Sequence, residues 1–275
     1  MQGTKQNRHF KDVLFKYVLK EKADLLELYN AINDSDYCDP EELEYNTLDD
    51  AVYLGIKNDV SFIIHNSMNL YEHQSTINPN MPLRGLFYFS SLYKKLVGDS
   101  FDIYGKKLVK LPTPQYIVFY NGKDELPDRV ELRLSDAFAT DGHTPSLECI
   151  ATVLNINQGH NQRIVEKCGK LFQYIQFNGK IREFQEQGFT MEDAVDMAVT
   201  YCMEHDILKQ ILTENRSAFM DDILTTYDAE KHMLPKPSDI IRRYLAAFTF
   251  CVYNIDTDIV NEPVGTDVSA NSDCP

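Results

Sequence analysis

Polar and apolar side chains alternate along residues 58–64, and residues 69–75 form a second run that reads as the returning strand. The first run is rich in β-branched and aromatic residues, and the segment 65–68 between the two runs is mostly polar. Alternation with a period of two is typical of strands, so the pattern predicts an antiparallel hairpin with its turn at residues 65–68. Side chains two positions apart would then share one face of this hairpin.

Two other segments have the spacing of helices. Apolar residues recur at helical intervals through residues 9–32, which predicts an amphipathic helix. Residues 83–97 have the same spacing with more apolar positions, which predicts a largely buried helix. Pro79 and Pro82 mark the start of this second helix, and Gly98 marks its end.

Continuous apolar runs predict the remaining strands. Residues 115–120 and 147–156 have the composition of strands covered on both faces, and residues 51–56 read as a strand that leads into the hairpin. The acidic, turn-rich segment 33–50 reads as an exposed connection. The predicted order is a helix, three strands, a helix, a strand and one more strand. This order favours an α/β fold, with a sheet flanked by helices.

The C-terminal part of the chain changes character. Residues 161–227 have the pattern of helices with short breaks, and Thr190 reads as a helix cap. We therefore expect an α/β core at residues 8–160 and a helical region packed on it at residues 161–235. Residues 236–275 are polar towards their end, and we expect an irregular, disordered tail.

Composition restricts the class of protein. The chain has 275 residues, 43% of them hydrophobic, which is enough for a substantial core. No apolar stretch is long enough to cross a bilayer, and the N-terminus lacks the apolar segment of a signal peptide. Six cysteines are scattered without a Cys-x-x-Cys pair, which argues against a structural zinc site. We expect a cytoplasmic protein without a membrane span.

The net charge of −15 opposes tight nonspecific binding to nucleic acid. The acidic excess lies mostly after residue 120, because residues 1–120 carry 13 Lys and Arg against 16 Asp and Glu. A local basic groove in the first half thus stays compatible with the composition. The lysines that could form it, or could equally be a solvated surface, are Lys94, Lys95, Lys106, Lys107 and Lys110.

The predicted hairpin brings candidate chemistry together. Asp59 would lie opposite Glu72 or Gln74, and these two share a face because they are two positions apart. Two carboxylates held so close repel each other, and a divalent cation is the usual remedy. Hard oxygen ligands favour Mg²⁺ or Mn²⁺ over zinc. The alternative is a hairpin with ordinary solvent-facing polar side chains.

These residues also carry a resemblance to a known family. Asn58-Asp59 and Glu72-His73-Gln74 resemble the two motifs of the PD-(D/E)XK nucleases, in the order and spacing of the bacterial recombination-promoting nuclease and transposase family. Gln74 departs from the motif, which has a lysine there. The resemblance spans about residues 8–235 and includes further segments: Phe10–Asp12, Leu25–Ile32, Asn78–Arg84, Phe119–Gly122 and Leu154–Asn157.

The resemblance implies a restriction-endonuclease-like core and a magnesium-dependent DNA endonuclease that acts in recombination or transposition. Asp59 and Glu72 would hold the metal, with the main-chain carbonyl of His73 as a third ligand. Gln74 would position water or phosphate, although an amide carries no charge and accepts no proton. Catalysis would therefore be weaker than at a lysine site. Lys57 could supply the missing charge.

Arg84 is the candidate for binding substrate. It lies one helical turn before Tyr88, and a guanidinium there could grip a phosphate through two hydrogen bonds. A structural ion pair explains the same residue equally well.

Two readings compete with an active nuclease. A degenerate copy would keep the fold and bind DNA or a protein without cutting, as the acidic charge and Gln74 favour. An interaction protein would use its C-terminal helices for self-association. A homodimer is compatible with this last reading and with the nuclease.

Overall fold

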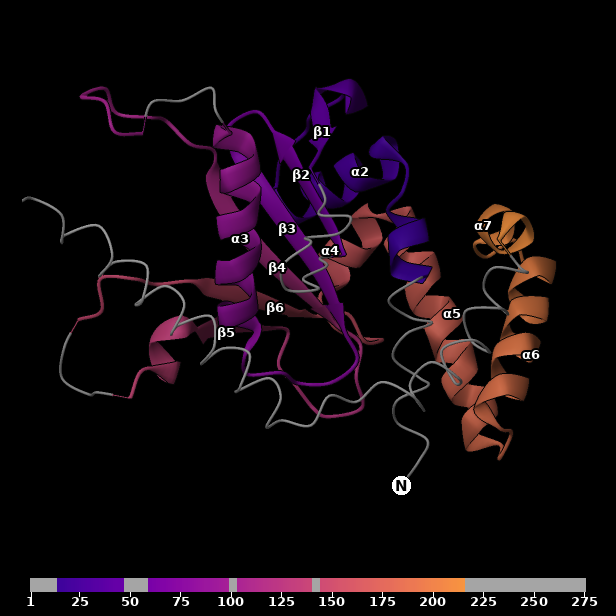
Figure 1. The fold of residues 1–275 in the computed structure, drawn as a ribbon. Helices are drawn as coiled ribbons and strands as arrows, with labels where there is room; N and C mark the ends of the chain where they lie inside the picture. The colour runs from indigo at the N-terminus through magenta and orange to yellow at the C-terminus, as the bar shows by residue number, and fades with distance from the viewer. Residues whose placement is uncertain (1–13, 47–58, 99–102, 140–143, 216–275) are drawn as a thin grey trace, which may run out of the picture. The chain divides into compact units, whose positions relative to one another are not determined.

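The computed structural model describes residues 14–46, 59–98, 103–139 and 144–215, and within them six strands form one mixed sheet (Figure 1). Its order is β1-β2-β3-β4-β6-β5. Strands β3, β4 and β6 run parallel to one another, whereas β1, β2 and β5 are antiparallel to their neighbours. The strands are β1 Leu43–Tyr45, β2 Val60–Ile64, β3 Ser67–Gln74, β4 Thr113–Tyr120, β5 Arg129–Arg133 and β6 Ile150–Asn155.

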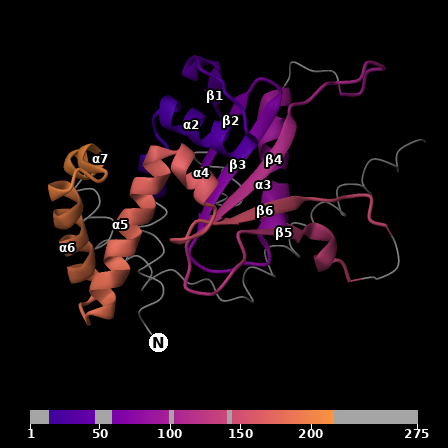
Figure 2. The same cartoon turned by 180° about the vertical axis from the view of Figure 1, so that it is seen from behind.

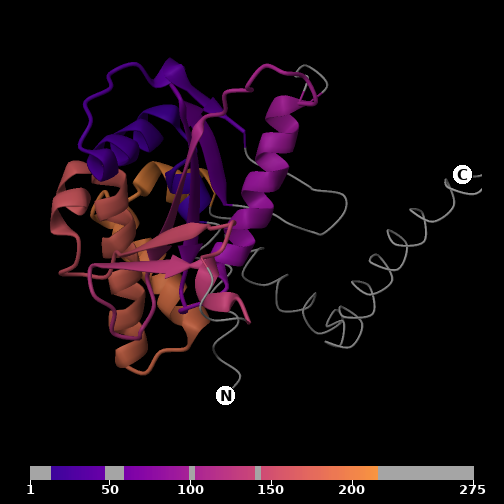
Figure 3. The same ribbon diagram turned by 90° about the vertical axis from the view of Figure 1, so that its left-hand side faces the viewer.

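Helices cover both faces of this sheet. Figure 3 shows α3 alone on one side and α2, α5 and α6 on the other, and Figure 2 shows α6 alongside α5. Residues 14–18 form a further helical segment on the α5 side. The helices are α2 Lys22–Asn33, α3 Met81–Val97, α4 Gln162–Lys167, α5 Gly169–Glu186, α6 Met191–Glu204 and α7 Lys209–Glu214, with short 3₁₀ turns at Pro40–Glu42 and Leu134–Ala137. The predicted α/β class, a sheet flanked by helices, is confirmed.

Alternate side chains of the central strand β4 enter two hydrophobic cores. Ile117 and Phe119 join the core under α2, α5 and α6, whereas Val118 and Tyr120 join the core under α3. Strand β4 is therefore buried on both faces, so its side chains have to be apolar on both. This explains the continuous apolar run seen in the sequence.

Helix α3 begins and ends where its sequence predicts. Pro82 lies in its first turn, where the missing amide proton leaves no hydrogen bond unmade. Gly98 follows its last residue with φ +45°, a conformation that favours glycine. Gly85 allows α3 to approach the sheet closely, because a Cβ there would lie 2.5 Å from the ring of Tyr116.

Several predicted boundaries are wrong. The hairpin loop has two residues, His65 and Asn66, and β3 already begins at Ser67. His65 takes φ +49°, which suits such a tight turn. Residues 33–50, predicted as a connection, contain the short strand β1. The predicted helix 9–32 is interrupted after residue 18.

Strand β5 escaped prediction altogether, because its alternation of charged and apolar residues is short. The strand predicted at residues 51–56 and the tail predicted at residues 236–275 lie outside the described residues. Thr190 caps α6 as predicted, since its hydroxyl accepts a hydrogen bond of 3.2 Å from the amide of Asp193. Among the described helices, none combines the length and apolar character that a membrane span requires.

Candidate functional site: a carboxylate pair on the hairpin

The hairpin register brings Asp59 and Glu72 together. Val60 pairs with Tyr71, so the next position outward on each strand is occupied by Asp59 and Glu72. The backbone amide of Asp59 donates a hydrogen bond of 3.1 Å to Glu72 Oε1, and the amide of His73 donates one of 2.9 Å to Asp59 Oδ2. Of the two expected partners of Asp59, the structure therefore places Glu72 opposite it. Asp59 and Glu72 are called the carboxylate pair below.

Two cations complete this cluster. Lys16 Nζ lies 3.2 Å from Asp59 Oδ1, and a nitrogen of the Arg84 guanidinium lies 2.8 Å from Glu72 Oε2. All four oxygens of the carboxylate pair thus have a donor within the protein. The Arg84 guanidinium also donates to the hydroxyl of Tyr88 at 2.7 Å.

Burial dominates the electrostatics of the cluster. The side chain of Glu72 is only 2% exposed, and burial, with the charge of Asp59 added, raises the pKa of Glu72 to about 8 despite the opposing effect of Arg84 and Lys16. Burial and the neighbouring Glu72 also raise the pKa of Tyr88 to about 12. Near neutral pH, Tyr88 therefore remains a neutral donor and acceptor.

The donor chemistry fits a hard divalent cation, although the set is small. Two carboxylates converge from adjacent strands, and oxygen ligands of this kind suit Mg²⁺ or Mn²⁺. Over the described ranges, no three side chains of His, Cys, Asp or Glu cluster in a way that could hold a metal. A cation would therefore have to draw Asp59 away from Lys16, or Glu72 away from Arg84, and complete its shell with main-chain oxygen and water.

The two residues after Glu72 point to opposite faces. The ring of His73 faces the α5 side, where its Nε2 lies 2.9 Å from the hydroxyl of Tyr174. Only its main chain stays beside the carboxylate pair. Gln74 points to the α3 side, as Glu72 does, and lines a small hollow of about 30 Å³ with Met81.

Sequence reasoning missed Lys16. It belongs to the helical segment 14–18, far from Asp59 along the chain, and no spacing rule connects them. Lys57, which was expected to supply charge, lies outside the described residues. The structure pairs Arg84 with Glu72, which is the ion-pair alternative left open by the sequence.

The candidate basic groove is remote from the carboxylate pair. Lys94 and Lys95 lie in the last turn of α3, and Arg84 lies in its first turns. Ten positions of α-helix separate Arg84 from Lys94, which is roughly 15 Å at 1.5 Å per residue. Lys106, Lys107 and Lys110 are exposed in the connection between α3 and β4.

A comparison of the chain with protein-family models, with curated proteins and with solved structures finds no match. The carboxylate pair, its cations and the topology of the sheet therefore have to support any functional proposal directly.

Proposed function

We propose that the chain is a metal-dependent DNA endonuclease of the PD-(D/E)XK type, linked to recombination or transposition. The observation that carries the proposal is the carboxylate pair itself. Asp59, just before β2, and Glu72, on the antiparallel strand β3, lie opposite each other. Glu72 accepts a hydrogen bond from the backbone amide of Asp59, and Asp59 accepts one from the backbone amide of His73. The family pattern needs two acidic residues in this arrangement, with Mg²⁺ or Mn²⁺ as the cofactor.

The order of elements supports the same proposal. A helix precedes three antiparallel strands, α3 follows β3, and β4 then lies parallel to β3. A restriction-endonuclease-like core would have this order, with the acidic residues on its second and third strands. Asp59 immediately precedes β2, and Glu72 lies near the end of β3.

Asp59 and Glu72 would hold the metal, together with the main-chain carbonyl of His73. When bound, a divalent ion of this kind lowers the pKa of a water molecule and offsets charge on a phosphate. Around it, Arg84 anchors Glu72, and the buried position of Glu72 excludes bulk water from that side. Gln74 would orient water or the substrate phosphate by hydrogen bonding.

Lys16 could take the role of the lysine that the family motif has at the position of Gln74. Its ammonium group touches Asp59, and its side chain is 43% exposed, so it can turn towards a phosphate without unfolding its helix. A lysine there would supply positive charge beside the scissile bond, which an amide cannot supply. Lys16 would then take the role that the sequence alone assigns to Lys57.

Plasmid cleavage with Mg²⁺ or Mn²⁺ tests the proposal. Wild type should nick or cut supercoiled DNA, and Asp59→Asn and Glu72→Gln should abolish cleavage while keeping the fold. Glu131→Gln is a matched control, because Glu131 is an exposed acid on β5 with an arginine partner. Cleavage that persists in Asp59→Asn would overturn the assignment.

One observation favours the second candidate, a module that binds DNA or a protein without cutting. All four oxygens of the carboxylate pair already accept from Lys16, Arg84 or a backbone amide, so the pair is neutralised without a metal. Calorimetry with Mg²⁺ and Mn²⁺ separates the two candidates. A nuclease should bind the ion, and Asp59→Asn should abolish that binding. A non-cutting module should show no heat of binding at this pair.

A further inference from the structure

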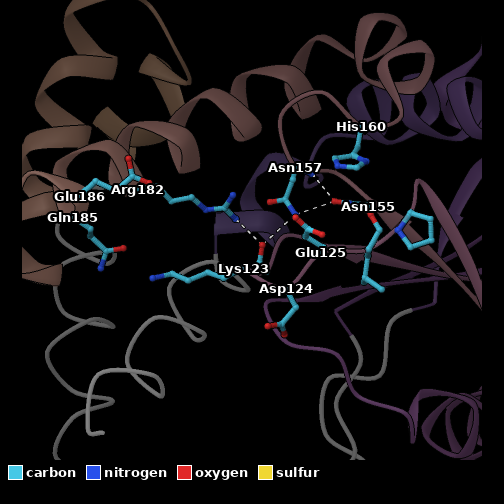
Figure 4. A pocket seen from close by; sticks show the side chains of 12 residues that line it. Lys123, Asp124, Glu125, Asn155, Asn157, His160, Arg182, Gln185 and Glu186 are labelled. Carbon is cyan, nitrogen blue, oxygen red and sulfur yellow. Dashed lines mark hydrogen bonds between the residues drawn. The ribbon is translucent and has the colours of Figure 1, made fainter.

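A second polar site lies at the carboxyl ends of β4 and β6, away from the α3 side where Glu72 points. A cavity of about 980 Å³ opens there between the segments after both strands and helix α5 (Figure 4). Ligand pockets in proteins have volumes of roughly 300–1,000 Å³, and in parallel sheets they occur preferentially beyond the carboxyl ends of the strands. Its size and position therefore suit a small organic ligand.

Arg182 provides the charge of this cavity. It reaches from α5 to the end of β4, where its guanidinium donates to the main-chain oxygen of Asn121 at 3.0 Å and to the side-chain oxygen of the same residue. The main-chain oxygen of Gly122 lies 3.4 Å away. Figure 4 shows the side chain of Arg182 extended towards the loops at the strand ends.

No carboxylate of the described residues lies within 4 Å of the Arg182 guanidinium, in contrast to Arg84 and Arg163. Burial lowers the pKa of Arg182, although an arginine still remains charged. A half-buried cation held only by neutral oxygens favours an anion from solution as its counter-ion.

Other polar groups face the same cavity in fixed positions. Asn155 is 2% exposed, and its side-chain oxygen accepts hydrogen bonds from the backbone and side chain of Asn157. His160 lies on the wall with its Nδ1 2.6 Å from Asp128, which leaves the Nε2 edge for a ligand. Lys123 adds an exposed ammonium group.

A smaller hollow of about 510 Å³ adjoins this cavity and shares Arg182 and Asn157 with it. Asn178 lines it one helical turn before Arg182 and is only 1% exposed. The side-chain oxygens of Asn178 and Asn157 are buried and have no hydrogen-bond partner in the described structure. Unpaired buried acceptors are rare, and they point to a donor that a ligand or its water would supply.

Three carboxylates lie at the rim of the cavity, at Asp124, Glu125 and Glu186. All three residues are exposed, so water and salt screen their charge more than that of Arg182. The rim carboxylates therefore weaken the attraction of anions towards the cavity. An anion that reaches the inner wall still meets cationic and amide donors there.

We infer that this cavity binds an organic phosphate, with Arg182 as the main ligand of the phosphate group and His160 and Lys123 as supporting ligands. The volume exceeds what an inorganic phosphate needs, so the rest of the cavity takes the group that the phosphate esterifies. A free nucleotide and the phosphorylated end of a nucleic-acid strand both offer this chemistry. The inference does not depend on the proposed nuclease activity.

Calorimetry of the full chain in EDTA tests the inference. The probes are inorganic phosphate, adenosine 5′-monophosphate, adenosine, and a short oligonucleotide with and without a 5′-phosphate. We expect the phosphorylated organic probes to bind more tightly than inorganic phosphate and their unphosphorylated counterparts to show no binding. Binding of adenosine 5′-monophosphate but not of the phosphorylated oligonucleotide would identify a free nucleotide as the ligand. The reverse result would identify the end of a nucleic-acid strand.

Variants locate the binding. Arg182→Gln should weaken the affinity about tenfold or more, because the phosphate loses a charged hydrogen-bond donor. His160→Gln and Lys123→Gln change surface positions and should weaken it severalfold without affecting the fold, so they keep the test valid if Arg182→Gln unfolds. Arg133→Gln, at an exposed arginine of β5, should bind as wild type.

Absence of binding by every phosphorylated probe would overturn the inference. Wild-type affinity in both His160→Gln and a folded Arg182→Gln would overturn it as well. Asp59→Asn should retain the binding in EDTA, so a failure of the nuclease proposal and a failure of this one give different results.

Discussion

The ammonium group of Lys16 lies 3.2 Å from the carboxylate of Asp59, and this contact joins the first described helical segment to the start of β2. The contact puts a flexible cation beside the acidic residue that the proposed activity needs most. It also offers an alternative to a metal, because it neutralises that residue. The predictions below separate these roles from each other and from the stability of the fold.

Replacement of Lys16 tests its part in cleavage. If Lys16 supplies the charge that Gln74 lacks, Lys16→Met should reduce the rate of plasmid cleavage about a hundredfold, as is typical for the loss of one electrostatic donor at a transition state. Lys16→Arg should keep part of the rate. Cleavage kinetics at saturating Mg²⁺ give the measurement.

Lys22→Met is the control for this effect, because Lys22 also pairs with an acidic residue, the exposed Glu41. It should leave cleavage unchanged. Equal rates for wild type and Lys16→Met would assign Lys16 to stability alone.

Removal of Arg84 should destabilise the fold. Arg84→Ala leaves the buried carboxyl of Glu72 without its cation, and breaking a buried pair in this way costs about 3–5 kcal/mol. We expect about 2 kcal/mol here, because the Arg84 side chain is 35% exposed and water can replace part of the contact. Urea unfolding in EDTA at pH 9 measures the change, because Glu72, with its pKa of about 8, is charged in the wild type at that pH.

The double variant Arg84→Ala with Glu72→Gln should recover part of this loss, because no buried charge then remains unpaired. Arg133→Ala, which breaks an exposed pair with Glu131, should change stability by less than about 0.5 kcal/mol. A strictly additive double variant would show that Arg84 and Glu72 do not interact in solution.

Two glycines in helix interiors should respond to alanine in opposite directions. At Gly85 a Cβ would lie 2.5 Å from the buried ring of Tyr116, so Gly85→Ala should destabilise the protein by about 1–3 kcal/mol. At Gly179 no atom lies within 4 Å of the added Cβ, so Gly179→Ala should stabilise it by about 0.5–1 kcal/mol. Thermal unfolding of both variants against wild type is the measurement, and the same sign for both would contradict the close approach of α3 to β4.

The buried thiols should resist modification. Burial raises the pKa of Cys168 to about 12 and that of Cys202 to about 11, so both stay protonated at pH 8 in the folded protein. The thiolate is the reactive form, and an exposed thiol such as Cys38 should react with iodoacetamide well before them. Mass spectrometry of the labelled peptides at pH 8, with and without urea, checks this order. Fast labelling of Cys202 in the folded state would contradict the packing of α6 against α5 that buries it.

The local pattern of polar and apolar residues was enough to locate the elements that short stretches of sequence determine. The β2–β3 hairpin, helix α3 with its end at Gly98, and the doubly buried strand β4 all follow from alternation, helical spacing or a continuous apolar run. Strands β1 and β5 lie at the two edges of the sheet and are short, so periodicity carried too little signal to identify them. The loop of the hairpin differed from its prediction because Ser67 is polar yet pairs with Ile64.

The amino-acid order was sufficient to choose Asp59 and Glu72, since a hairpin brings close positions together with a known period. It could not choose their partners. Lys16, Arg84 and Arg182 reach their sites from helices that approach the sheet from both faces, and such contacts depend on how those helices pack. Packing is set by the complementarity of whole buried surfaces, which no short stretch of sequence contains, and it alone brought each cation to its oxygen atoms.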